Sequence, residues 1–363
     1  MQGSRHTARP GCVAPCGRAH TYITRSRLQM VTSRPTDCFL GRALLPIALL
    51  LIGCGGPQST LEPAGRSSAR IASLFWWMTG GTAVIWLGVV ALALYAAHQR
   101  GEPHDVGMAR RLIVIGGVAF PIIVLTGLLI YGLAMMPATL AEAPAGSLRV
   151  EVTGEQWWWR VRYLPPGGRP VDLANEIRLP VGEPVEFQLE SRDVIHSFWI
   201  PALGGKMDMI PGRRTRLRLE PTKTGVFRGV CAEYCGRSHA FMSFSVVVEE
   251  REAFARWLAD QAAPAALPAA PRAAEGQGLF LANGCGSCHT IRGTVADGVI
   301  GPDLTHVGGR LFVGAGRLGN QAEDFRRFIA HTGDFKPGVL MPDFGMLGAR
   351  QLSSLGAYLD GLK

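Results

Sequence analysis

Two short segments of the chain concentrate side chains that bind soft metal ions. The first runs from Cys231 to Met242 and also contains Cys235 and His239. The second, His196-Ser-Phe-Trp-Ile-Pro201, supplies another imidazole. Thiolate, thioether and imidazole are ligands that copper favours. Two cysteines separated by three residues can bridge a pair of ions, with one histidine completing each ion and the methionine as a weak outer ligand. The pattern therefore predicts a binuclear copper centre for electron transfer.

A structural zinc site is the alternative for these residues, because zinc also binds two cysteines and two histidines. Zinc sites do not use a methionine ligand such as Met242, however, and the spacing differs from the usual zinc-finger patterns. Copper is therefore the favoured metal.

A second redox motif lies near the C-terminus, at Cys285-Gly-Ser-Cys288-His289. This spacing is the attachment sequence for c-type haem, in which two thiols bond to the haem vinyl groups and the adjacent histidine ligates iron. A redox dithiol or half of a zinc site is the alternative. A zinc site needs two more ligands, and the thiols of Cys231 and Cys235 are already assigned to copper.

The opposite axial ligand of this haem is expected to be Met341, since a thioether facing histidine raises the iron potential. Met346 competes for the same role. His306 and His331 could also bind iron, but a lone histidine near haem is more often a hydrogen-bond partner or a surface residue.

The motifs His-Ser-Phe-x-x-Pro and Cys-x-Glu-x-Cys-Gly-x-x-His-x-x-Met closely resemble subunit II of haem–copper cytochrome oxidases. The segments 203–213 and 154–159 also resemble that family, and all of these motifs follow one another in the family's order and at the family's spacings. Further on, Gly301-Pro-Asp-Leu304 and Met341-Pro342 resemble the loops of small class I cytochromes c. From about Ser59 onward the chain thus looks like a subunit II with a fused cytochrome c, as in caa-type oxidases.

The resemblance implies a role for each matching residue. The implied copper ligands are His196, Cys231, the backbone carbonyl of Glu233, Cys235, His239 and Met242, with the two cysteines bridging. It also implies that the Glu233 carboxylate reaches a magnesium ion at the contact with subunit I. Trp157 is implied to be an electron-entry residue at the donor surface, with simple aromatic packing as the alternative. Asp193 and Asp208 either orient ligands and neighbours through hydrogen bonds or are solvated loop acids.

The N-terminal region is expected to be a targeting segment. Arg42 precedes an apolar run, 43–53, that is too short to span a bilayer comfortably and that ends in Leu51-Ile-Gly-Cys54. This ending resembles a bacterial lipobox, which implies cleavage before Cys54 and lipid attachment to its sulfur. An ordinary signal peptide is the alternative. Residues 1–29 are unusual for a signal, so Met30 is an alternative start that would leave Cys12 and Cys16 outside the protein.

Two longer apolar runs, Ile71–Tyr95 and Leu112–Met136, carry no charge and predict membrane-spanning helices. The loop between them contains Arg100, Arg110 and Arg111. The positive-inside rule places this loop in the cytoplasm, and both soluble regions on the outer, periplasmic face of a bacterial cell membrane. A buried helical hairpin of a soluble protein is the alternative.

The remaining segments define the fold class, a multidomain membrane protein. Short alternating segments between Leu148 and about Glu250 suggest an antiparallel sandwich or barrel, and the resemblance implies a cupredoxin-like domain. An Ala/Pro stretch then predicts a linker, and helical patterns at 322–331 and 351–362 suit a small all-α class I cytochrome c domain. The expected order is a signal peptide with lipobox (1–53), a lipidated segment (54–70), a transmembrane helical hairpin (71–136), the copper domain (148–260), the linker (261–274) and the cytochrome c domain (275–363).

The net charge of +9 does not point to nucleic acid. Residues 1–53 hold seven arginines and one acid, which leaves 30 basic against 27 acidic residues in the remainder. The family instead implies an electron-input subunit, with oxygen reduction and proton translocation carried out by a haem–copper subunit I. The other implied partners are subunit III and cytochrome c or another reduced donor. No catalytic acid, base or nucleophile is expected on this chain. A copper-containing nitric oxide reductase subunit and a free membrane-tethered electron carrier are the alternatives.

The chain departs from the family pattern at two places. Many relatives place a glutamate at the start of the second span, at the mouth of a proton-uptake path, whereas Gly107-Met-Ala-Arg-Arg111 contains no acid. Glu155 also stands where histidine is frequent. The first departure puts in doubt whether this chain lines a proton channel, and neither affects the metal sites.

Overall fold

The computed structural model describes residues 55–98 and 105–363. The expected signal peptide, its lipobox and the lipid-attachment residue Cys54 lie outside these residues.

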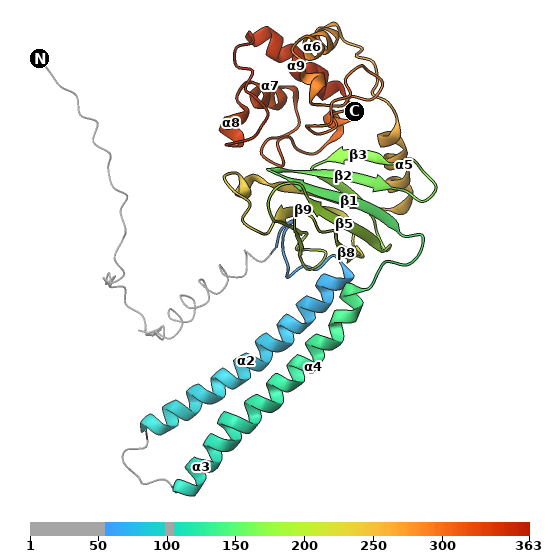
Figure 1. The fold of residues 1–363 in the computed structure, drawn as a ribbon. Helices are drawn as coiled ribbons and strands as arrows, with labels where there is room; N and C mark the ends of the chain where they lie inside the picture. Colours follow the sequence, from blue (N-terminus) through green and yellow to red (C-terminus); the bar gives the residue numbers. More distant parts are fainter. Residues whose placement is uncertain (1–54, 99–104) are drawn as a thin grey trace, which may run out of the picture. The chain divides into compact units, whose positions relative to one another are not determined.

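A helical hairpin opens the described chain (Figure 1). It consists of α2 (Arg66–His98), α3 (Val106–Val114), a π-helical turn (Ile115–Ala119) and α4 (Phe120–Leu140). The Asp105 carboxylate caps α3 by accepting hydrogen bonds from the backbone N–H groups of Gly107 and Met108. By length and composition, both arms can cross a membrane.

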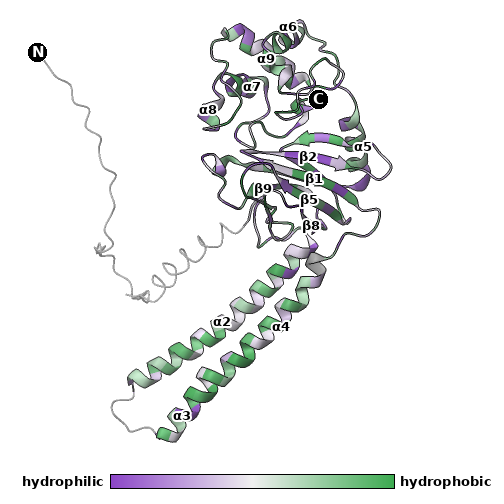
Figure 2. Ribbon diagram, in the orientation of Figure 1, coloured by the Kyte–Doolittle hydropathy of each residue, from purple (hydrophilic) through white to green (hydrophobic). Residues whose placement is uncertain are grey.

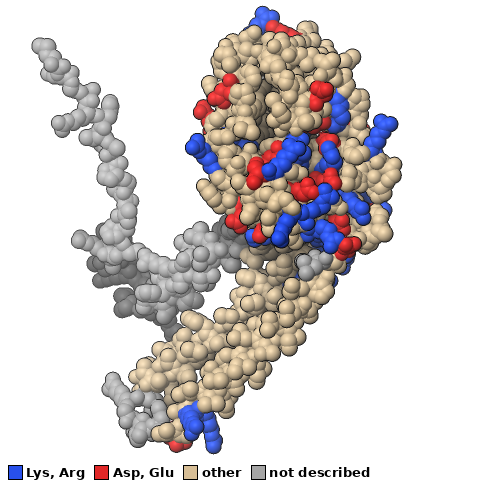
Figure 3. Space-filling model, viewed as in Figure 1, with Lys and Arg blue, Asp and Glu red and all other residues tan. Residues whose placement is uncertain are grey.

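The surface of this hairpin is apolar. Large side chains such as Trp77, Trp86 and Ile123 are exposed along it. Figure 2 shows hydrophobic colouring along most of both helices, and Figure 3 shows almost no charged side chain on them until the end near α3. A surface of this kind is stable only when something apolar, such as lipid, covers it.

Ten strands follow the hairpin and form two five-stranded sheets. The orders are β3-β2-β1-β5-β8 and β4-β10-β9-β6-β7. Their bounds are β1 Leu148–Glu155, β2 Trp158–Leu164, β3 Val171–Ala174, β4 Glu176–Pro180, β5 Val185–Ser191, β6 His196–Trp199, β7 Met207–Met209, β8 Thr215–Leu219, β9 Gly225–Cys231 and β10 Ser243–Glu249. The alternation of buried and open positions along these strands has the period of two that the sequence shows. The all-β prediction for this region is confirmed, but the sheets are mixed and not purely antiparallel, because β1 pairs with β5 and β10 with β4 in parallel.

The core between the sheets is aromatic directly behind the ligand loops. Phe198 of β6 stacks on Phe244 of β10 with ring centroids 4.9 Å apart, and Trp159 of β2 meets Phe244 edge-on at 5.2 Å. All three side chains are fully buried. Such aromatic pairs add to the stabilisation that comes from burial alone. They give the strands that carry the candidate ligands a rigid base.

Helix α5 (Arg251–Ala262) follows the last strand and packs Phe254 and Trp257 against Tyr163. Helix α6 then begins at Pro271, inside the segment 261–274 that the composition predicts as linker. Proline suits the first turn of a helix because its missing N–H has no partner there. Only residues 263–270 of the Ala/Pro stretch therefore lie outside a helix. This segment is still bonded to the C-terminal region, because the Ala265 N–H donates to the Arg292 carbonyl at 2.8 Å.

The C-terminal region is helical, as the sequence predicts. Its helices after α6 (Pro271–Ala282) are α7 Ala322–Ala330, α8 Thr332–Phe335 and α9 Ala349–Gly361, with short 3-10 turns at Cys285–Ser287 and Val307–Gly309. Helices α6 and α9 approach closely at Gly276, where a Cβ would lie 2.0 Å from the Ser354 carbonyl oxygen. Phe280 and Tyr358 pack edge-to-face beside this contact. We call residues 271–363 the cytochrome unit and residues 148–262 the copper domain.

One prediction concerns the aromatic core of the copper domain. A Cβ added at Gly229 of β9 would lie 2.0 Å from the Phe244 ring, so Gly229→Ala must displace that ring. Overpacking of this kind costs roughly 1–3 kcal/mol, and we expect a matching fall in unfolding free energy, measured by denaturant titration. Gly205→Ala is the control, because nothing lies within 4 Å of a Cβ at that position. Equal stability of the two variants would contradict the packing described above.

Candidate functional site

The candidate copper ligands come from two neighbouring strands and the loop between β9 and β10. His196 opens β6, Cys231 ends β9, and the 3-10 turn His239–Phe241 precedes β10. Two backbone hydrogen bonds close the loop: the Cys231 N–H donates to the Met242 carbonyl at 3.0 Å, and the Ala232 N–H donates to the Ser197 carbonyl at 2.9 Å. Strand pairing thus brings together residues that lie far apart in the sequence.

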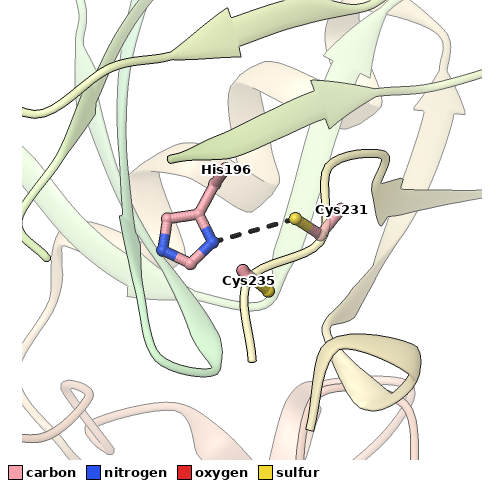
Figure 4. A group of neighbouring side chains, drawn as sticks. All are labelled: His196, Cys231 and Cys235. Atoms are coloured by element: carbon pink, nitrogen blue, oxygen red, sulfur yellow. Dashed lines mark hydrogen bonds between the residues drawn. The ribbon is translucent and has the colours of Figure 1, made fainter. Parts of the chain in front are cut away.

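The expected ligand atoms gather in one place. The Nδ1 or Nε2 atom of His196 and the Sγ atoms of Cys231 and Cys235 lie within 4.8 Å of one another. Figure 4 shows the His196 ring facing the Cys231 sulfur, with Cys235 beside them. The Cys231 Sγ lies 3.8 Å from His196 Nδ1 and 3.1 Å from the Glu233 carbonyl oxygen.

The two remaining expected ligands lie beside the second sulfur. The Cys235 Sγ is 3.5 Å from His239 Nδ1 and 3.8 Å from the Met242 Sδ. Each sulfur therefore has one imidazole and one weaker ligand atom within 4 Å. A donor set that divides into two halves in this way fits a pair of soft ions better than a single zinc ion.

The protonation of the two thiols is coupled. A hydrogen bond from Cys235 lowers the pKa of Cys231 against the opposing effect of burial, and the same contact raises the pKa of Cys235. Two buried thiols that share one proton in this way are ready to lose it to metal ions, which bind cysteine as thiolate.

An outer layer of hydrogen bonds fixes the ligand loops. Asp193 Oδ1 lies 2.8 Å from His196 Nε2, which leaves Nδ1 facing Cys231. The other oxygen of Asp193 accepts from the backbone N–H of Gln156 at 2.6 Å. The Gln156 side-chain amide and the Trp157 indole N–H both donate to the Cys235 carbonyl, at 2.7 and 2.9 Å. Carboxylates bound to the far nitrogen of a metal-binding histidine set its tautomer and orientation.

The second acid that the sequence singles out has another partner. Asp208 Oδ1 accepts from the Ser197 hydroxyl at 2.7 Å and from the Lys206 ammonium at 3.0 Å, so it contacts the neighbour of a ligand. Glu233 has an exposed side chain beside the similarly exposed Tyr234. Its carboxylate is therefore free to meet a partner surface.

Trp157 has a different environment from that of an exposed entry residue. Its side chain is only 6% exposed and belongs to the core of the copper domain. A Cβ at Gly338 of the cytochrome unit would lie 3.1 Å from its ring. The indole is thus covered by this chain, and its role in electron entry stays a prediction.

The second candidate site surrounds His289 in the cytochrome unit. Cys285 begins a 3-10 turn and Cys288 follows its end, and the His289 N–H donates to the Cys285 carbonyl at 3.0 Å. The His289 Nδ1 bonds the Pro302 carbonyl at 2.8 Å, which leaves Nε2 available as a ligand. Burial lowers the pKa of His289, so the neutral ring that a metal needs is the stable form.

The structure also separates the candidates for the opposite axial position. Met341 packs against the core of the cytochrome unit, whereas Met346 is 78% exposed. His306 is buried, but its Nε2 bonds the Ala263 carbonyl at 3.0 Å, and His331 is exposed. These environments favour Met341.

One buried polar atom fits a carboxylate-bearing haem. In the part of the chain that the structure describes, Arg310 Nε is among the buried atoms without a hydrogen-bond partner. Burial lowers the pKa of Arg310, which indicates a cation that lacks enough compensating charge. Haem propionates carry that charge. Sequence reasoning missed Arg310, because a single arginine after a Gly-Gly pair gives no local signal of burial.

Comparisons with known proteins agree with this organisation. Residues 164–250 match the family model described as cytochrome c oxidase subunit II, periplasmic domain, and residues 273–363 match the model of cytochrome c. Cytochrome c oxidase subunit 2 of Alkalihalophilus pseudofirmus is 32% identical over 337 residues, which cover 87% of this chain and 95% of the relative. The same subunit of a Bacillus species is 32% identical over 345 residues, with the same coverage.

A solved structure is also similar to the chain. It is the periplasmic domain of subunit II of cytochrome oxidase from Bradyrhizobium japonicum, with 35% sequence identity and a TM-score of 0.31. The match covers 34% of this chain and 96% of that domain.

We expect Asp193→Asn to weaken copper binding by roughly 10- to 100-fold, because the amide holds the His196 ring less firmly than the carboxylate. A competition titration with a copper chelator measures this change. Asp208→Asn is the matched control, since Asp208 contacts Ser197 and Lys206 and no expected ligand side chain. If both variants bind copper as the unaltered chain does, Asp193 does not position the ligand.

A further prediction concerns Gly301, where a Cβ would lie 2.5 Å from the Cε1 atom of His289. We expect Gly301→Ala to tilt the ring while both haem thioether bonds still form, because the two cysteines are untouched. The absorption band of methionine-ligated ferric haem should weaken, and the haem potential should shift. Gly278→Ala on α6 has free space around it and serves as the control. An unchanged band in Gly301→Ala would show that the ring does not lie where the structure has it.

Proposed function

Because the chain belongs to the cytochrome c oxidase subunit II family, we propose that it carries electrons from an external donor, through a covalent haem c and then a binuclear copper centre, to a haem–copper subunit I. It is thereby a subunit of an oxidoreductase whose oxygen-reducing site lies on another chain. Subunit I reduces oxygen to water and translocates protons, and subunit III completes the complex.

The clustering of the six expected copper ligands carries this proposal. His196, Cys231 and the Glu233 carbonyl form one group of contacts, and Cys235, His239 and Met242 form the other. When bound, the copper pair and the haem supply one-electron carriers. The protein's contribution is to hold the ligands in a fixed arrangement, so that little has to move when the charge changes.

A haem c would be held by Cys285 and Cys288 through thioether bonds and by His289 and Met341 as iron ligands. The His289 ring is oriented by its bond to the Pro302 carbonyl, and the Met341 side chain lies against the core. Arg310 would offer its unpaired Nε to a propionate. The residues present thus fit a covalently bound haem.

The proposed location is a bacterial cell membrane, crossed twice by the hairpin. The basic residues Arg110 and Arg111 of α3 favour the cytoplasmic side for this end of the hairpin. The copper domain and the cytochrome unit then face the periplasm. The exposed Glu233 carboxylate is proposed to bind magnesium at the contact with subunit I. A lipid on Cys54 would be a second anchor on the same side as the copper domain.

The test is to purify the membrane complex through an affinity tag on this chain and to measure its metals, haems and spectra. We expect copper at about two ions per chain, a covalent haem c, a mixed-valence copper signal in electron paramagnetic resonance, and a second haem-bearing subunit that reduces oxygen. Zinc in place of copper would refute the copper relay. A complex that reduces nitric oxide, or a chain without any second haem protein, would replace the oxidase with one of the two alternatives.

A further inference from the structure

The cytochrome unit contacts the copper loop through buried polar groups. The Ser238 hydroxyl donates to the Pro337 carbonyl at 2.8 Å, and the Ser243 hydroxyl donates to the Ala315 carbonyl at 2.7 Å. Both serines are buried. Each lies within one residue of an expected copper ligand, His239 or Met242. Two loops of the cytochrome unit are therefore joined to the loop that holds the second sulfur.

Glycine allows these loops to come close. A Cβ at Gly316 would lie 2.6 Å from the Ser243 hydroxyl, and one at Gly338 would lie 3.1 Å from the Trp157 ring. Both glycines have positive φ, at +83° and +85°, a conformation that side-chain-bearing residues rarely adopt. Backbone therefore packs directly on the copper domain at two points.

Lys336 is the unusual residue of this contact. It is 3% exposed, and its ammonium donates to the backbone carbonyl of Trp157. Among the lysines in the described chain, only Lys206 and Lys363 form ion pairs, so no carboxylate compensates Lys336. Burial lowers its pKa to about 7, with the charge of Cys235 acting in the opposite direction.

The acceptor of this hydrogen bond belongs to the layer that fixes the copper ligands. The Trp157 indole N–H donates to the Cys235 carbonyl, and the preceding residue, Gln156, contacts both Cys235 and Asp193. A single carbonyl thus connects the cytochrome unit to the layer that orients one sulfur and one imidazole of the copper site.

We propose that Lys336 is a positioning residue. Its hydrogen bond to the Trp157 carbonyl selects one placement of the cytochrome unit on the copper domain, which we call the register. This inference rests on the proposed function, because the register matters when electrons pass between the two units. A buried cation with a hydrogen-bond partner adds little to the stability of the fold, but a buried cation that has lost its partner destabilises it strongly. Any register that moves the ammonium away from the carbonyl without returning it to water is therefore disfavoured. Lys336 acts by excluding alternatives, which is how buried polar groups confer specificity.

The test compares Lys336→Met with the unaltered complex and with Lys363→Met, an exposed lysine of the same unit. Nitroxide-bearing unnatural amino acids replace the exposed Arg251 on α5 and Arg350 on α9, and pulsed electron paramagnetic resonance measures the distance between them. Flash photoreduction of haem c, followed by its reoxidation, gives the rate of electron transfer to copper. Thermal unfolding is recorded for all three proteins.

We expect one narrow distance distribution for the unaltered chain and for Lys363→Met. For Lys336→Met we expect a broadened or split distribution and a transfer rate that is roughly tenfold lower and no longer a single exponential. Its unfolding temperature should be unchanged or higher, because methionine fills the site without a charge. A purely structural lysine would instead lower stability along with the rate.

An unchanged distance distribution or an unchanged transfer rate in Lys336→Met would overturn the register proposal. A failure of the proposed function is recognised separately. In that case the unaltered complex lacks the copper or haem c signal, and the nitroxide distances, which need neither group, still report the docking.

Discussion

Most of the copper domain can be understood from one constraint: two thiols must lie side by side between two imidazoles that come from different parts of the chain. His196 and Cys231 are 35 residues apart, and the pairing of β6 with β9 brings them together. Strand β1 passes close to the imidazole at Gly154, where a Cβ would lie 2.7 Å from the His196 ring. The aromatic stack of Phe198 on Phe244 supports the same strands from behind. Sheet, glycine and core thus all limit the movement of the ligands, which is what electron transfer with little rearrangement requires.

The cytochrome unit must also hold its ligands in place, and it does so with a smaller fold. Its helices α6 and α9 touch through Gly276, and Gly301 lets a loop lie against the His289 ring. A unit of this size buries little apolar surface by itself, so a large planar cofactor would provide much of its core. The unpaired Nε of Arg310 is the polar part of the same fit, since this donor needs an acceptor that the described chain does not supply.

Local sequence patterns were enough to predict most of the elements and the histidine, cysteine and methionine ligand candidates, whereas the Glu233 carbonyl followed only from the family resemblance. The alternation in Val185–Ser191 and the uncharged runs within Arg66–His98 depend only on neighbouring residues, and the ligand spacings carry their chemistry with them. The burial of Lys336 could not be predicted in this way. It depends on a contact with Trp157, 179 positions away, and a lysine in the sequence ordinarily indicates an exposed surface. The start of α6 at Pro271 was missed because the Ala/Pro composition hides a helix that is stabilised by packing against α9.

A covalent tether and a docking surface solve different parts of the transfer problem. A short linker raises the effective concentration of the donor to roughly the millimolar range, but it leaves the orientation open. Orientation has to come from contacts that only one register can form. The contacts between the units include hydrogen bonds from Ser238, Ser243 and Lys336 to backbone carbonyls, whose positions are fixed by the fold of the opposite unit. An interface of this kind can afford modest affinity, since the tether provides the encounter, and it can use buried polar groups to reject misaligned docking.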